Sequence, residues 1–315
     1  MVAVGTLNVD LIIIGSAPRE MEALTQWVAP SEIEIAAAGS VGYCAVDLAR
    51  LGLKVAMLSS VADDPFGEVI IKQLQAEGVN TDAVEVEPDT ISGLGVYMLL
   101  FGSKKRPLTG RLATHAPWPT NLSEPAEEML KAGRLLHCGG YLHYPQMWGE
   151  PTEKLFQKAK ALGLITSLDT QFPFAPVEGP WRECFGNLLQ AVDLIFCDEN
   201  EAENITGKKS PEDAARELLA AGPRLAVVKM GEQGALLAVK DKLVRQPPFP
   251  MAKITDAIGA GDAFDAGVIY GSLHSWNLEQ TARFASATAA LTLAGLGGAQ
   301  TAPTLSEVQA LLNQH

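Results

Sequence analysis

The sequence is short of positive charge and of long apolar runs, and each shortage excludes a class of protein. Its 315 residues carry 24 Lys and Arg against 37 Asp and Glu, a net charge of -13. That balance argues against a nucleic-acid-binding protein, because phosphate backbones are bound through clustered basic side chains. No apolar run reaches membrane-spanning length, and the N-terminus lacks the basic segment of a secretory signal.

Cysteine is also scarce. The four cysteines show no Cys-x-x-Cys spacing, and Cys44, Cys138 and Cys197 lie in apolar surroundings. This pattern predicts buried free thiols rather than zinc ligands or disulfides. We therefore expect a soluble protein of a reducing compartment, the cytoplasm.

Two common nucleotide-binding motifs are missing. A dinucleotide-binding fold would need Gly-x-Gly-x-x-Gly after the first strand, where the chain has Gly5-Thr6-Leu7-Asn8. The Walker pattern Gly-x-x-x-x-Gly-Lys-Ser/Thr does not occur either. The sequence thus excludes a Rossmann dehydrogenase and a P-loop enzyme.

The chain is rich in apolar segments, which alternate between strand patterns and helical patterns. Hydrophobic residues make up 47% and charged residues 19%, which suffices for a sizeable core. Continuous apolar runs predict strands at 2–4, 54–60, 135–138, 165–169, 194–197 and 225–230. Helical patterns lie at 40–51, 66–77, 123–132, 153–162, 199–206, 210–221, 261–273, 278–294 and 305–313. The alternation predicts one α/β domain over residues 1–315, with three layers and a mostly parallel central sheet.

Two stretches interrupt this alternation. Residues 11–37 are polar and charged without a clear helix, and residues 83–118 contain short strand patterns at 83–86, 94–101 and 107–113. These strands have no helices to cover them. An uncovered sheet must bury its apolar face elsewhere, so we expect a small second sheet here.

The most informative segment is residues 254–265. Gly259, Ala260 and Gly261 are small enough for their N–H groups to approach an anion, and they begin an apolar helix whose positive end favours phosphate. Asp262 adds a carboxylate whose pKa that helix end should keep low. An anion site beside a base is the minimal apparatus for moving a phosphoryl group onto a hydroxyl. A plain glycine-rich turn is the alternative.

This segment resembles the signature Asp-Thr-x-Gly-Ala-Gly-Asp of the ribokinase-like (PfkB) carbohydrate kinases, with Ala257 in place of Thr. Further resemblances follow in the family's order at residues 5–10, 38–52, 61–67, 77–79, 198–203 and 229–234. The resemblance implies a ribokinase-like three-layer α/β/α fold. Segments 11–37 and 83–118 would form a β-sheet lid over the substrate, and the lids of two subunits would cover each other in a homodimer.

The resemblance also implies catalytic and metal-binding roles. Asp262 would accept the proton of the substrate hydroxyl as it attacks the γ-phosphate of ATP, with the three preceding residues as the anion hole. Asp198 and Glu201 would hold Mg²⁺ and its water shell, although helix capping explains both residues as well. Asp256 would help to form a monovalent-cation site for K⁺, or would cap a turn.

The nucleotide is expected at the carboxyl ends of the strands, as in other open α/β sheets. By resemblance, Lys229, Gly231, Gly234 and Ser286 would face it. Gly231 and Gly234 are equally well explained as turn glycines of a hairpin.

The expected substrate residues depart most from the family. By resemblance, Asn8 and Asp10 would bind sugar hydroxyls, for which carboxylates are good acceptors. The other residues expected at the substrate are Gly39, Ser40 and Tyr43. Ala38 replaces the first Gly of that signature, Tyr43 replaces the substrate-facing Asn, and the Lys of ribokinases is absent. These departures argue against ribose as the acceptor.

Three functions remain open from the sequence. The first is an ATP- and Mg²⁺-dependent kinase of a sugar or polyol. The second is a nucleoside kinase in which Tyr43 stacks on the base. The third is a catalytically weak sensor on the same scaffold, motivated by Ala38, Tyr43 and Ala257. The intact Gly-Ala-Gly and Asp262 favour an enzyme.

Overall fold

The computed structural model describes residues 1–101, 107–119, 121–251, 254–295 and 301–314. Within these residues the large sheet contains β1 (Val2–Gly5), β4 (Ala56–Ala62), β5 (Asn80–Glu87), β8 (Leu135–Gly139), β9 (Ile165–Asp169), β10 (Leu194–Asp198), β11 (Leu225–Lys229), β12 (Ala235–Val239) and β13 (Lys242–Gln246). Their order is β13-β12-β11-β10-β9-β8-β1-β4-β5. Two pairs, β11–β12 and β12–β13, are antiparallel, and the other neighbours pair parallel.

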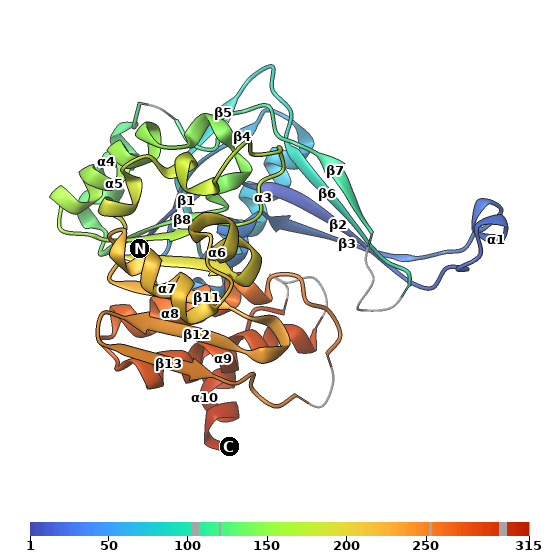
Figure 1. Ribbon diagram of the computed structural model, residues 1–315. Coiled ribbons are helices and arrows are strands. Elements are labelled where there is room, and N and C mark those ends of the chain that lie inside the picture. The colour runs from blue at the N-terminus through green and yellow to red at the C-terminus, as the bar shows by residue number, and fades with distance from the viewer. Residues whose placement is uncertain (102–106, 120, 252–253, 296–300, 315) are drawn as a thin grey trace.

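Both faces of this sheet are covered, as the continuous apolar runs predict (Figure 1). Successive strand residues point to opposite faces, so Ala3 joins one core while Val2 and Val4 join the other. On the first face lie α2 (Ser40–Arg50), α3 (Pro65–Ala76), α8 (Ala260–Leu273) and α9 (Leu278–Ala294), with α10 (Leu305–Gln314) against α9. On the second lie α4 (Glu124–Ala132), α5 (Glu150–Ala161), α6 (Glu199–Thr206) and α7 (Pro211–Ala220). The predicted three-layer fold is confirmed.

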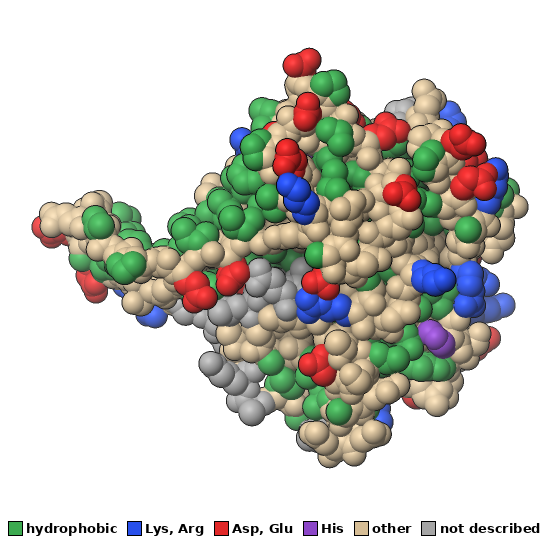
Figure 2. Space-filling view, turned by 180° about the vertical axis from the view of Figure 1, so that it is seen from behind, with side chains coloured by type: hydrophobic (Ala, Val, Ile, Leu, Met, Phe, Trp, Pro, Cys, Tyr) green, Lys and Arg blue, Asp and Glu red, His purple; other side chains and the backbone are tan. Residues whose placement is uncertain are grey.

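A second sheet projects from this body as an arm (Figure 1). We call it the lid sheet; it has the order β3-β2-β6-β7, with β2 (Asn8–Ile14), β3 (Glu32–Ala38), β6 (Gly93–Leu99) and β7 (Leu108–Arg111). A short helix, α1 (Met21–Thr25), lies near its tip. Hydrophobic side chains lie along the arm (Figure 2), including Ile33, Ile35 and Leu108, which are 59%, 42% and 54% exposed.

Two expectations about these segments were wrong or incomplete. The strand expected in the lid at 83–86 belongs to β5, which pairs with β4 at the edge of the large sheet and buries Ala83 in its core. The segment 11–37 contains the helix α1. No residue of α1 is buried, so no apolar face marks this helix in the sequence. Residues 102–106 of the expected lid segment lie outside the described residues.

The sequence predicted the hairpin of β11 and β12 only as an alternative explanation of Gly231 and Gly234. Gly234 has a φ of +88°, and a Cβ there would lie 2.0 Å from the backbone oxygen of Gln246. That position therefore requires glycine, which supports the turn interpretation of Gly234. All four cysteines are free and buried, as predicted. No helix among the described residues is long and apolar enough to cross a membrane.

Two glycines of the large sheet allow α2 to start close to it. β1 lies between β8 and β4, so the strand connections diverge at this point, where open sheets bind ligands. A Cβ on Gly5 would lie 2.6 Å from the Gly139 oxygen, and a Cβ on Gly139 would lie 2.8 Å from the Val41 nitrogen. Because these two glycines have no Cβ atom, Ser40, the first residue of α2, can lie over the carboxyl ends of the strands.

Candidate active site

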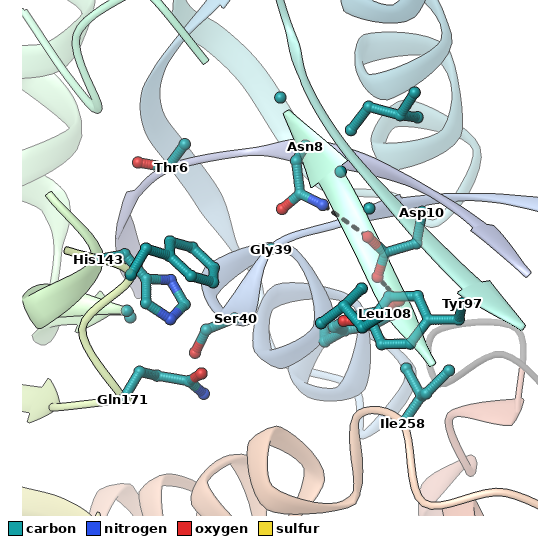
Figure 3. Close-up of a pocket in the computed structure, with 18 of the residues that line it drawn as sticks. Thr6, Asn8, Asp10, Gly39, Ser40, Tyr97, Leu108, His143, Gln171 and Ile258 are labelled. Atoms are coloured by element: carbon teal, nitrogen blue, oxygen red, sulfur yellow. Dashed lines mark hydrogen bonds between the residues drawn. The ribbon is translucent and has the colours of Figure 1, made fainter. Parts of the chain in front are cut away.

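A cavity of about 620 Å³ lies between the lid sheet and the carboxyl ends of the large sheet. Figure 3 shows Tyr97 and Leu108 on one side of it, His143 and Gln171 on the other, and Ser40 between them. The residues that the sequence assigned to substrate and catalysis and that line this cavity are Asn8, Asp10, Gly39, Ser40, Tyr43, Gly259, Gly261 and Asp262. The fold therefore brings together residues from three separate parts of the chain.

The N-terminus of α8 faces this cavity. Gly259 is its N-cap, with a left-handed φ of 74° that favours glycine. Ala260 follows as the first helical residue. Among the described residues, none accepts a hydrogen bond from the N–H of Gly261 or of Asp262. These free donors at the positive end of a helix are suited to a phosphoryl group.

Asp262 is 7% exposed, and its Oδ1 accepts a hydrogen bond of 2.7 Å from the Ser40 hydroxyl. Burial, followed by the negative charge of Asp169, raises the pKa of Asp262 to about 7, against the opposing effect of Lys229. The expectation that the helix end would keep this pKa low was wrong, because burial and a neighbouring carboxylate outweigh a partial charge. Near neutral pH the carboxylate is therefore balanced between its two protonation states, as suits a general base.

A buried ion-pair network lies behind Asp262. The Lys229 ammonium is 3.0 Å from Asp169 Oδ1 and 2.9 Å from Asp265 Oδ2. The same Ser40 hydroxyl that contacts Asp262 is 3.0 Å from Asp169 Oδ2. Lys229, expected at the nucleotide, is thus a counter-ion to two carboxylates. Sequence reasoning missed Asp169, although its position at the end of a predicted strand was a usable signal.

One side of the cavity is built around Asp10. Asn8 Nδ2 donates to Asp10 Oδ1 over 2.7 Å (Figure 3), and the Tyr43 hydroxyl donates to Asp10 Oδ2 over 2.6 Å. Gly95 lies opposite Asp10 on β6, and a Cβ there would be 2.5 Å from Asp10 Oδ1. Tyr43 is 5% exposed, so its ring is packed rather than available for stacking on a base.

The opposite wall carries residues that the sequence did not single out as ligands. The rings of His143 and Phe174 stack with centroids 4.1 Å apart. Gln171 has a φ of 57°, which is uncommon for a residue other than glycine, and it lines the cavity. Such strained positions are found disproportionately at ligand sites. No sequence pattern signals them.

Asp198 and Glu201 lie at the start of α6, outside the cavity lining. They form a capping box: Asp198 Oδ1 accepts from the Glu201 N–H at 2.8 Å, and Glu201 Oε2 accepts from the Asp198 N–H at 3.0 Å. Both residues therefore cap the helix, as the alternative to metal binding predicted. Burial, then the charges of Asp169 and Asp198, raise the pKa of Glu201 to about 7.

The negative charge that gathers around Glu201 favours a bound cation. The described residues contain no cluster of three or more His, Cys, Asp or Glu side chains that could hold a metal alone. Mg²⁺, however, commonly takes one or two carboxylates and completes its shell with water and substrate phosphate. The donor set at Asp198 and Glu201 fits such a partly hydrated ion.

Two expected residues have local partners. Asp256 is buried, and its Oδ1 accepts from the N–H groups of Ala257 and Ile258 at 2.6 and 3.2 Å. It lies in an irregular segment before α8, where these two hydrogen bonds fit the turn-capping alternative. The Ser286 hydroxyl on α9 donates to the Pro247 oxygen at 3.2 Å. Neither residue lines the described cavity.

An anion-binding helix end, a buried carboxylate beside it and a lidded cavity with polar groups define a phosphotransferase for a small hydroxylated molecule. The family model described as pfkB family carbohydrate kinase matches residues 2–305, and the chain belongs to that family. The predicted family and the predicted carbohydrate kinase activity are thereby confirmed.

Individual relatives resemble nearly the whole chain. The deoxyribokinase of Salmonella typhi is 29% identical over 318 residues, which cover 98% of this chain and 97% of that protein. The 5-dehydro-2-deoxygluconokinase of Clostridium perfringens is 25% identical over 288 residues, covering 88% and 83%. The structure of Arabidopsis thaliana ribokinase complexed with ribose and ATP has a TM-score of 0.80 at 21% identity and covers 99% of this chain and 97% of that one.

Proposed function

We propose that this carbohydrate kinase transfers the γ-phosphoryl group of ATP to a hydroxyl of a deoxy sugar, with Asp262 as the general base. The observation that carries the proposal is the buried Asp262 carboxylate at the cavity, beside the free N–H groups of α8. Ionised Asp262 accepts the proton of the acceptor hydroxyl. Gly259, Ala260 and Gly261 form the turn at the start of α8, where the free N–H groups of Gly261 and Asp262 would stabilise the transferred group, while the Ala260 N–H donates to the Ala257 oxygen.

The deoxy acceptor is inferred from Tyr43. Its hydroxyl donates to an oxygen of Asp10 that a sugar hydroxyl would otherwise reach, and Asn8 occupies the other oxygen. A carbon without a hydroxyl leaves no donor to compete with Tyr43. The names of two relatives, a deoxyribokinase and a 5-dehydro-2-deoxygluconokinase, support this class of acceptor. Gly39 and Ser40 complete the floor beneath it.

The proposed cofactors are ATP, Mg²⁺ and K⁺. Asp198 and Glu201 would hold Mg²⁺, which neutralises phosphate charge when bound. We place the nucleotide along the turn of Gly231 and Gly234 and beside Ser286. A K⁺ site near Asp256 belongs to the same proposal.

We further propose a homodimer formed through the lid sheets, in the cytoplasm. Ile33 and Ile35 on β3 alternate with glutamates, so their exposed side chains share one strand face. Exposed apolar residues on a projecting sheet support a partner surface. A second copy of the chain would cover them.

An ADP-release assay tests the acceptor class. It compares 2-deoxy-D-ribose, D-ribose, 2-deoxygluconate, a polyol and adenosine at equal concentrations with ATP and Mg²⁺. The proposal predicts the highest kcat/KM for a deoxy sugar. A clear preference for ribose would overturn the deoxy inference, and a preference for adenosine would establish the nucleoside kinase instead. Saturable ATP binding without turnover of any sugar would favour the sensor.

A further inference from the structure

The Ser40 hydroxyl lies between two carboxylates at the active site. Its oxygen is 2.7 Å from Asp262 Oδ1 and 3.0 Å from Asp169 Oδ2. A hydroxyl has a single proton to donate, so it can serve one of these carboxylates at a time. The structure therefore contains two acceptors for one donor, in a site where 8% of Ser40 and 1% of Asp169 are exposed.

The two carboxylates differ in how they are neutralised. Burial alone would raise the pKa of Asp169, but the charge and hydrogen bond of Lys229 hold it below its ordinary value. Asp169 therefore stays ionised and remains a permanent acceptor. Lys229 is held from its other side by Asp265, so this counter-ion is fixed in place.

We propose that Ser40 and Asp169 are positioning residues for the base: Ser40 aims the Asp262 carboxylate at the acceptor, and turns its own proton to Asp169 when Asp262 receives a proton. The inference rests on the proposed role of Asp262. In the reaction the acceptor oxygen bonds to the γ-phosphorus, and the bond from that phosphorus to the bridging oxygen breaks as ADP leaves. The acceptor's proton moves to Asp262, and the Ser40 proton changes direction without leaving its oxygen.

This arrangement gives the two residues opposite effects on Asp262. The Ser40 hydrogen bond stabilises ionised Asp262, whereas the Asp169 charge destabilises it and offers Ser40 an alternative acceptor. Protonated Asp262 needs no donor, so the released Ser40 proton then stabilises Asp169. A residue that only packed against Asp262, without a charge or hydrogen bond to it, would leave this pKa unchanged.

Other titratable groups also face Asp262. They come from the lid, from α2, from α8 itself and from the end of β11, and they are Asp10, Tyr43, Cys44, Asp47, Asp265 and Lys229. Their effect is through space, and among the described residues Asp169 is placed to share the hydroxyl that contacts Asp262. Substituting Ser40 and Asp169 separately leaves these other groups in place.

The test is a titration of the Asp262 carboxyl carbon by NMR in protein labelled with ¹³C-aspartate. The resonance is identified by its absence from the spectrum of Asp262→Asn. Ser40→Ala should raise the midpoint by about one pH unit, and Asp169→Asn should lower it by about one unit. Asp213→Asn removes the same charge from an exposed residue and should leave the midpoint unchanged.

Two results would overturn the proposal: midpoints that move in the same direction, or a midpoint that stays fixed in either variant. Ser40→Ala removes one oxygen, and Lys229 keeps Asp265 as a partner in Asp169→Asn, so both variants should fold. The titration needs no substrate or ATP. A failure of this inference is thus distinct from a failure of the kinase proposal, which would appear as absent phosphoryl transfer.

Discussion

Replacing Asp262 by Asn should make the protein more stable, by an amount that grows with pH. The folded protein holds the pKa of Asp262 at about 7, against 3.8 for an ordinary Asp, chiefly through burial. Between these values the unfolded chain releases a proton that the folded chain retains. Stability contributed by this group is therefore complete below pH 4 and is lost as the pH rises through 7.

The size of the effect follows from the same two values. At about 1.4 kcal/mol per pKa unit, the raised pKa of Asp262 lowers the free energy of unfolding, relative to its value below pH 4, by about 2 kcal/mol at pH 5 and about 4 kcal/mol at pH 8. Asn is neutral at both, and its carbonyl can still accept the Ser40 hydrogen bond. The stability gained by Asp262→Asn should thus be about 2 kcal/mol larger at pH 8 than at pH 5.

Thermal unfolding at the two pH values measures this difference. At about 2 °C per kcal/mol for a chain of this size, the Tm gain should be about 4 °C greater at pH 8. Asp213→Asn, at an exposed position, serves as the control and should show no such pH dependence. An equal gain at both pH values, or a loss of stability at both, would refute the assignment of a raised pKa to Asp262.

Three further predictions concern the acceptor, the metal and the dimer. Tyr43→Phe removes the hydroxyl that donates to Asp10 Oδ2, so the ratio of kcat/KM for ribose to that for deoxyribose should rise about tenfold, as measured by ADP release; an unchanged ratio would contradict the role of Tyr43. Glu201→Gln should raise the Mg²⁺ concentration required for half-maximal activity by about tenfold or more, whereas Glu199→Gln on the exposed side of the same helix should not. Ile35→Lys should convert a dimer to a monomer in sedimentation, and a wild-type monomer would exclude the lid interface.

The layers of the fold were predictable because they depend on local patterns. Buried parallel strands are apolar on both faces, and covering helices repeat every 3.6 residues, so both leave a signal in the sequence. The edge strand β5 was misplaced because its pairing with β4 depends on the crossover through α3. A short strand pattern does not state which sheet it joins.

The proposed base Asp262 could be named from the sequence, but its surroundings could not. Asp169 and Lys229 meet because β9, β10 and β11 are neighbours, a fact of sheet order. The contact of Tyr43 with Asp10 depends on how the lid sheet docks against α2. The pKa of Asp262 depends on both, since burial and the nearby carboxylate determine it. Long-range packing therefore determines the neighbours and the pKa of Asp262, which the motif alone does not.

The most direct test of the central claim is single-turnover transfer of label from [γ-³²P]ATP to the best acceptor, measured from pH 5 to pH 9. For the wild-type protein the rate should rise with pH through about 7, as Asp262 loses its proton. For Asp262→Asn it should be about 10²–10⁴-fold lower and flat over this range. Transfer by Asp262→Asn at the wild-type rate would contradict the assignment of Asp262 as the base.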